Sequence, residues 1–170
     1  MTITEGMIRA ARLDASLYEQ VEADPTATGQ ATIVVLLSAV AAGIGSARLG
    51  AANLVGAAVV ALLTWYVWAG LTYVIGTRLL KEPQTQADFG QLLRTIGFAS
   101  SPGVLRVVGI VPGLTTLVFA LSGLWMLVAM VMAVHQALDY SSTWRAVVVV
   151  IIGWIVQVTA LQIVLRGAFI

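Results

Sequence analysis

The sequence predicts an all-α membrane protein, a bundle of five transmembrane helices preceded by an amphipathic helix. Of its 170 residues, 59% are hydrophobic and 10% are charged, and the mean hydropathy is +0.96. Soluble domains carry about a quarter charged residues. A chain of this size has too little interior to hide so much apolar surface from water. We therefore expect most of the chain to be surrounded by lipid.

Four stretches without Asp, Glu, Lys or Arg mark the expected spans. They are residues 25–47, 49–77, 107–134 and 146–165. Each holds the roughly 20 helical residues that cross the hydrocarbon core of a bilayer. A β-barrel strand would alternate apolar and polar residues, whereas residues 33–40 are apolar on every side. The spans are therefore expected to be helices.

Residues 4–24 are expected to form one amphipathic helix outside the bilayer or on its surface. Its apolar residues recur at spacings of three and four, which is the period of one helix face. These residues are Met7, Ala10, Leu13, Leu17 and Val21. The first 24 residues hold five acidic residues, unlike the basic start of a signal peptide. We divide the chain into a cytoplasmic amphipathic segment, residues 1–25, and a single five-span membrane domain, residues 26–170.

The first two spans are expected at residues 30–47 and 54–76, joined by a short polar turn at 48–53. Residues 78–94 form the one sizeable polar insert between spans, and they are expected outside the membrane. Within the insert, residues 88–96 are predicted to begin a surface helix with an apolar face toward the membrane. That face consists of Phe89, Leu92, Leu93 and Ile96.

A hairpin must fold within residues 104–138, because 35 helical residues would measure about 52 Å, against about 30 Å for the bilayer core. Pro112 and Gly113 are the favoured break, and Ser122 and Gly123 are the alternative. The favoured break gives a third span at residues 93–111, interrupted near Pro102 and Gly103. The fourth span is then residues 114–138. A loop at residues 139–143 leads to the fifth, residues 144–165.

The distribution of basic residues predicts a cytoplasmic N-terminus and an external C-terminus. In this orientation six basic residues lie inside and two lie outside, while Arg106 falls within a span. The inside residues are Arg9, Arg12, Arg78, Lys81, Arg94 and Arg145, and the outside residues are Arg48 and Arg166.

Arg106, His135, Asp139 and Arg94 are the candidate interaction or polar membrane residues. His135 and Asp139 are four residues apart, so a helix would place both on one face. They form either a carboxylate–imidazole pair, as a proton relay or ligand pair requires, or an interfacial pair that marks the helix end. Arg106 pairs with Asp139, binds a lipid phosphate or extends to the nearer interface. The apolar stripe of the N-terminal segment is expected to pack on protein. That protein is either an external partner or the chain's own polar insert, where Arg78, Lys81 and Arg94 offer charge complementary to the acidic residues.

No catalytic, cofactor or metal site is expected. Cysteine is absent and His135 is the single histidine, so a metal would lack ligands. Ser122 and Gly123 resemble the serine motif of rhomboid proteases, but His135 lies 13 residues further on, about 20 Å along a helix. No catalytic dyad can form. A net charge of +1 gives no basic surface for nucleic acid.

Small residues at intervals of four, Ala39, Gly43 and Ala47, allow close approach of another helix. Packing within the monomer and a dimer face are the two interpretations. The expected partners are membrane lipids and a membrane-protein partner or a second copy of the chain.

Several stretches are typical of one family of membrane proteins. They are residues 17–24, LYEQVEAD; 97–103, GFASSPG; 110–114, IVPGL; and 136–140, QALDY. With the five-span layout, these stretches resemble the Yip family, the Ypt/Rab-interacting membrane proteins, especially its bacterial members. The resemblance implies a non-enzymatic, multi-pass protein of the bacterial inner membrane that acts through membrane proteins or lipids, in membrane organisation or a trafficking-like role. A small transporter or channel is the alternative.

Overall fold

A computed structural model describes residues 1–47 and 54–167, with the backbone alone at 160, 161 and 163–167. Every regular element in this part is a helix. The elements are α1 (Ile3–Ala11), α2 (Ala15–Ala23), α3 (Ala27–Gly45), α4 (Leu54–Val74), the π-helix η2 (Ile75–Leu79), α5 (Phe89–Ala99), the 3-10 helix η3 (Ser101–Ile110), α6 (Thr115–Ala137) and α7 (Thr143–Gly167). The predicted turn at 48–53, with Arg48, lies outside the described residues.

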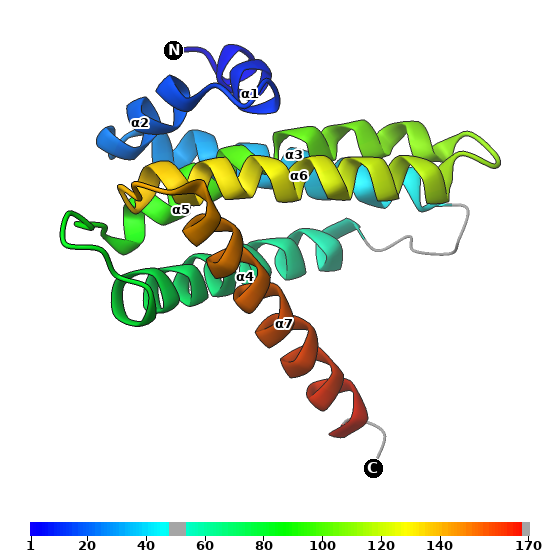
Figure 1. The fold of residues 1–170 in the computed structure, drawn as a ribbon. Helices are drawn as coiled ribbons and strands as arrows, with labels where there is room; N and C mark the ends of the chain where they lie inside the picture. Colours follow the sequence, from blue (N-terminus) through cyan, green and yellow to red (C-terminus); the bar gives the residue numbers. More distant parts are fainter. Residues whose placement is uncertain (48–53, 168–170) are drawn as a thin grey trace.

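The combined element α5–η3 is the centre of the bundle. It packs against α2, α3, α4 and α6. Figure 1 shows α1 and α2 on one side of the bundle and α4 on the other, while α7 runs away from the rest toward the C-terminus. The prediction of an all-helical fold is confirmed for the described residues.

The N-terminal segment forms two helices, so the prediction of one continuous helix over residues 4–24 is wrong. Leu13 has a left-handed φ of 61° and ends α1. The carboxylate of Asp14 then accepts a hydrogen bond from the Ser16 amide at 3.0 Å and caps α2. A short polar side chain that binds the backbone in this way favours a new helix start over continuation of the old one.

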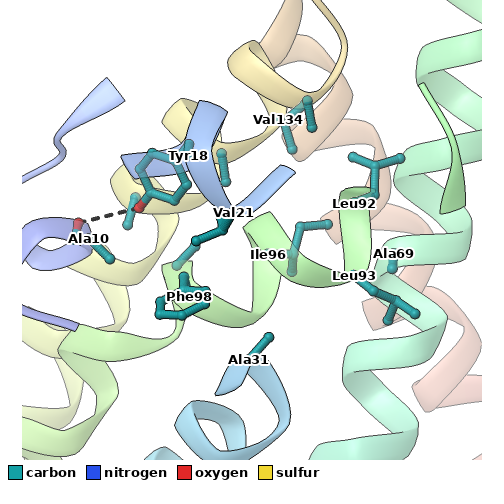
Figure 2. Packing of buried hydrophobic residues seen from close by; sticks show 14 of the residues in the cluster. Ala10, Tyr18, Val21, Ala31, Ala69, Leu92, Leu93, Ile96, Phe98 and Val134 are labelled. Atoms are coloured by element: carbon teal, nitrogen blue, oxygen red, sulfur yellow. Dashed lines mark hydrogen bonds between the residues drawn. The ribbon is translucent and has the colours of Figure 1, made fainter. Parts of the chain in front are cut away.

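The apolar residues of α1 and α2 pack against the bundle. Figure 2 shows Tyr18 and Val21 of α2 facing Ile96 and Phe98 of α5. The Tyr18 hydroxyl donates to the Ala10 carbonyl oxygen at 3.3 Å, which joins α2 to α1. The predicted stripe is therefore the docking face of both helices, with Ala10, Leu17 and Val21 buried and Met7 and Leu13 partly buried.

Three helical segments in the described residues are long and apolar enough to cross a membrane. They are Ala27–Gly45, Leu54–Leu79 and Thr115–Ala137, and a shorter apolar stretch covers Thr143–Thr159. The outward faces of α3, α4, α6 and α7 carry exposed large apolar side chains such as Leu37, Leu63, Leu124 and Ile155. Apolar exposure on this scale is typical of a surface that contacts lipid.

The third predicted span consists of two helices of different type. Asp88 and Gln91 form a capping box that starts α5. The α-helix ends at Ala99, and Pro102 lies in the first turn of η3, so the predicted interruption is confirmed. The expected membrane-facing surface of α5 is wrong for Leu92, Leu93 and Ile96, which are 0%, 5% and 1% exposed, whereas Phe89 is exposed as expected. The neighbouring helices cover this face.

The predicted break at Pro112 and Gly113 is confirmed. The chain turns between η3 and α6, and Gly113 has a φ of +83°, which favours glycine. The alternative break at Ser122 and Gly123 is wrong, because both residues lie inside α6.

Close approach of α3 to η3 depends on two glycines. A Cβ atom at Gly45 would overlap the Arg106 carbonyl oxygen, and one at Gly103 would overlap the Ser38 hydroxyl. Gly43 of the predicted stripe lies against Leu54 of α4. Small residues of α3 therefore serve packing within the monomer, as the first interpretation predicted.

Candidate functional site

Arg106 lies on η3 and has no charged partner among residues 1–47 and 54–167. Its Cζ atom is 5.5 Å from the centroid of the Phe119 ring, a cation–π contact. Its Nη2 lies 3.9 Å from the position that a Cβ atom at Gly123 would occupy. Its Nε is buried and makes no hydrogen bond within the described part of the chain. The described residues therefore leave this partly buried cation without a counter-charge.

Two clefts meet at Arg106. The larger has a volume of about 390 Å³ and lies between α3, α4 and α6, with the end of α5 and Arg106 of η3 also lining it. Its lining residues are Val35, Ser38, Ala39, Ala42, Ala57, Val60, Ala61, Thr64, Trp65, Trp68, Ile96, Ser100, Arg106, Met126 and Met130. The smaller, of about 270 Å³, is lined by Trp68, Arg106, Gly123, Met126, Leu127, Met130 and Trp154. Arg106 is the one charged side chain among the described residues that line the two clefts. Val60, which lines the larger cleft, is 61% exposed, so this cleft is open on the side of α4.

The proposed pairing of Arg106 with Asp139 is wrong. Arg106 contacts α6 at Phe119 and Gly123, close to the start of that helix at Thr115. Asp139 follows the opposite end. The 16 residues from Gly123 to Asp139 correspond to about 24 Å along a helix, which is too far for an ion pair. A lipid phosphate and extension to the interface are the interpretations that agree with this position.

The structure does not bring His135 and Asp139 together as a pair. Helix α6 ends at Ala137, and Asp139 is exposed with a left-handed φ of 49°. The four-residue register of a helix therefore no longer holds at Asp139. No hydrogen bond joins the two side chains, and the buried His135 Nδ1 has no partner in the described residues. Both residues mark the end of α6, as the second interpretation predicted.

Arg94 holds the N-terminal segment against the bundle. Its Nε donates to the Val21 carbonyl oxygen at 2.8 Å, and its Nη2 donates to that of Glu22. Nearby, Gln91 donates to the Glu22 carboxylate at 3.0 Å. A cation at the last carbonyls of a helix satisfies acceptors and complements the helix dipole. Arg94 is therefore the docking residue for α2.

Glu22, whose backbone carbonyl accepts from Arg94, has a carboxyl group with a strongly raised pKa. Burial raises its pKa from 4.5 to about 7, and the charge of Asp139 adds to the effect. Arg94 acts in the opposite direction, while Glu19 and Asp88 raise the pKa slightly further. The docked position of α2 therefore favours a protonated Glu22 carboxyl group.

A second polar cluster, around Glu82, was not predicted. The buried Glu82 carboxylate accepts hydrogen bonds from the Ser141 amide at 2.9 Å and the Ser141 hydroxyl at 3.1 Å, and it pairs with Arg145 Nε at 2.7 Å. These hydrogen bonds, above all the one from the Ser141 amide, lower the pKa of Glu82. Nearby, the Tyr140 hydroxyl donates to the Gly76 carbonyl oxygen at 3.1 Å. The cluster joins the loop before α5 to the loop before α7, across about 60 residues of sequence.

These features define a helical integral membrane protein with apolar outward faces, polar contacts that join its loops, and one unpaired cation in a cleft. Among residues 1–47 and 54–167, no group of three or more His, Asp or Glu side chains could hold a metal ion. The family model of the Yip1 domain matches residues 15–165, and the chain belongs to this family. No curated protein matches the chain, and neither does any solved structure.

Proposed function

We propose that this Yip1-domain protein spans the membrane five times and acts, without catalysis, by binding membrane lipids and membrane proteins. The observation that carries the proposal is the cleft at Arg106, which combines apolar walls with a single unpaired cation. A site of this composition suits an amphiphile better than a soluble metabolite, which would require several polar contacts. The proposed role is membrane organisation or a trafficking-like process in a bacterial inner membrane.

The five proposed spans are α3, α4 with η2, α5–η3, α6 and α7. The 11 residues of α5 and the 10 of η3 extend about 36 Å at about 1.5 and 2.0 Å per residue. The 25 residues of α7 extend about 37 Å. Both lengths exceed the roughly 30 Å of a bilayer core. An odd number of spans places the two termini on opposite sides, with the N-terminus proposed in the cytoplasm.

This arrangement places α1 beside the bundle and not only at its end. The Trp125 Nε1 donates to the Ala11 carbonyl oxygen at 2.8 Å, and Trp125 lies 12 residues, about 18 Å, from the end of α6 at Ala137. The end of α1 at Ala11 then lies beside α6, well inside the end of that helix. Arg9 is compensated there by Asp14, Ser16 and Gln20, with contacts of 2.7 to 3.0 Å.

The proposed lack of catalysis is supported by the structural contacts that the buried polar side chains make. Arg94 binds the end of α2 and Glu82 joins two loops, so both are engaged in contacts that hold the fold. No nucleophile, acid and base converge at the Arg106 clefts, which are lined by apolar residues and a few hydroxyl groups.

A small transporter or channel is the second candidate. The interruption between α5 and η3 favours it, because broken helices near a polar residue are typical of transport sites.

Copurification from native membranes, followed by reconstitution, distinguishes the two candidates. We expect cross-linking to recover a reproducible membrane-protein partner or a retained lipid, and liposomes containing the protein to leak solutes no faster than protein-free liposomes. Solute or ion flux that depends on Arg106, with Arg78→Gln as the matched control at an exposed arginine, would replace the proposed function by transport.

A further inference from the structure

We infer that the joined clefts bind one anionic glycerophospholipid, with its phosphate on Arg106 and its two acyl chains in the two clefts. The inference rests on the proposed membrane function and names the ligand of that site. The lipid would come from the leaflet on the side of the turn at residues 111–114.

The charge of the site selects an anion. The guanidinium has an aromatic face at Phe119 and a buried Nε without an acceptor. No Asp or Glu lines either cleft, so the protein itself supplies no counter-charge there. The planar guanidinium matches the oxygens of a phosphate diester in a two-pronged contact. A zwitterionic lipid also has this phosphate, but its ammonium group would bring a second cation into a site without a carboxylate.

The shape of the site matches a headgroup with two chains. The clefts of about 390 and 270 Å³ share Trp68, Met126 and Met130 in addition to Arg106. They therefore adjoin along these residues, and Arg106, which would hold the phosphate, lines both. One passes between α3 and α4 and the other passes beside α7, where Trp154 lines it. The walls are mostly apolar, as acyl chains require, with hydroxyl groups of Ser38, Thr64 and Ser100 in the larger cleft. The flexible methionines adapt to chains of different length.

The depth of Arg106 matches the phosphate layer. Phe119 and Gly123 lie four and eight residues from the start of α6 at Thr115, which corresponds to about 6 to 12 Å. An arginine side chain extends over such a distance toward the interface. The acyl chains would then run toward Trp65 and Trp68, which lie deeper along α4 and are nearly buried.

The experiment compares lipid retention by the full chain and three variants in nanodiscs that contain equal parts of phosphatidylglycerol and phosphatidylcholine. After extraction in neutral detergent, native mass spectrometry counts the lipids that stay bound. The variants are Arg106→Gln, Arg106→Lys and the control Arg78→Gln. We expect one phosphatidylglycerol on the parent and on Arg78→Gln, at least a tenfold weaker retention by Arg106→Gln, and an intermediate value for Arg106→Lys.

A fourth variant keeps the test decisive if Arg106→Gln folds poorly. Gly123→Leu keeps the charge but fills the space beside Nη2, and it should reduce retention of phosphatidylglycerol by a similar factor. Inorganic phosphate, added as a soluble competitor, should not displace the lipid.

Three results would overturn the inference: equal retention by Arg106→Gln and Arg78→Gln, equal binding of phosphatidylcholine, or displacement by inorganic phosphate. A protein partner that copurifies while no lipid is retained would also overturn it, yet would leave the proposed function in place. Flux through Arg106 would instead refute the proposed function.

Discussion

Replacement of Arg94 by methionine should loosen α2 from the bundle without unfolding the spans. Methionine has a similar length but donates no hydrogen bond, so the carbonyl oxygens of Val21 and Glu22 lose their shared donor. A hydrogen bond to a charged group contributes about 1.5–3 kcal/mol. Because two such bonds to one side chain are not fully additive, we expect a loss of about 3 kcal/mol in the docking of α2.

This loss corresponds to about a hundredfold increase in the equilibrium for local opening, at about 1.4 kcal/mol per factor of ten. Hydrogen exchange followed by mass spectrometry in lipid nanodiscs measures it directly, because exchange of a locally opening helix reports the opening free energy. Amides of α2 should exchange about a hundred times faster, whereas α3 and α6 should be unchanged. Arg94→Lys replaces the two donating nitrogens of the guanidinium by one ammonium group, so it should give a smaller increase in the exchange rate of α2.

The control is Arg78→Gln, which removes a positive charge from the exposed end of η2 and should leave the exchange of α2 unchanged. Leu17, Tyr18 and Val21 are buried and no variant changes them, so α2 should open transiently but stay associated. Equal exchange of α2 in the parent and Arg94→Met would refute the reasoning, and loss of α2 in Arg78→Gln would show that charge alone holds it.

Three further predictions concern stability in detergent. The raised pKa of Glu22, about 7 against 4.5, means that stability is present at low pH and is lost as pH rises through this window; Glu22→Gln should therefore flatten the decline in melting temperature between pH 5 and 8. Gly45→Ala should lower the free energy of unfolding by about 2 kcal/mol, because the added Cβ atom overlaps η3. Gly29→Ala, in the same helix, is the control: its Cβ atom would have nothing within 4 Å, so it should stabilise the protein slightly. Glu82→Ala should lower the melting temperature more than Arg145→Ala, because Glu82 also accepts two hydrogen bonds from the loop before α7, and equal losses would contradict this role.

The positions of the long helices could be predicted because their signals are local. The helices α3, α4 and α6 lie largely within charge-free stretches of the sequence. The turn after η3 could be located because Pro112 has no backbone N–H to donate and Gly113 tolerates the left-handed backbone. The same argument located the interruption at Pro102. The prediction of a membrane-facing surface on residues 88–96 was less successful, because burial of Leu92 depends on which helices cover α5.

The contacts of the candidate site could be predicted only in part. Arg78, Lys81 and Arg94 were predicted together as a complement to the acidic segment, and of the three Arg94 binds that segment. Its acceptors are backbone carbonyls more than 70 residues away, so no residue type reveals them. The Glu82 cluster was missed for the same reason, although Tyr140 beside it lies in one of the stretches that resemble the Yip family. The predicted pairing of Asp139 with His135 or Arg106 failed, because it assumed that Asp139 continues α6. The left-handed backbone of Asp139 instead follows the end of that helix.

Cysteine labelling in intact cells tests the five-span arrangement most directly, because the chain holds no cysteine of its own. Single cysteines replace Gln86 and Ser142, which are exposed in the loops before α5 and α7, and Leu114, which is exposed in the turn before α6. An impermeant thiol reagent should label Leu114→Cys in intact cells and label Gln86→Cys and Ser142→Cys only after the membrane is opened. Labelling of all three from the same side would contradict the proposal that α5–η3 and α6 each cross the membrane.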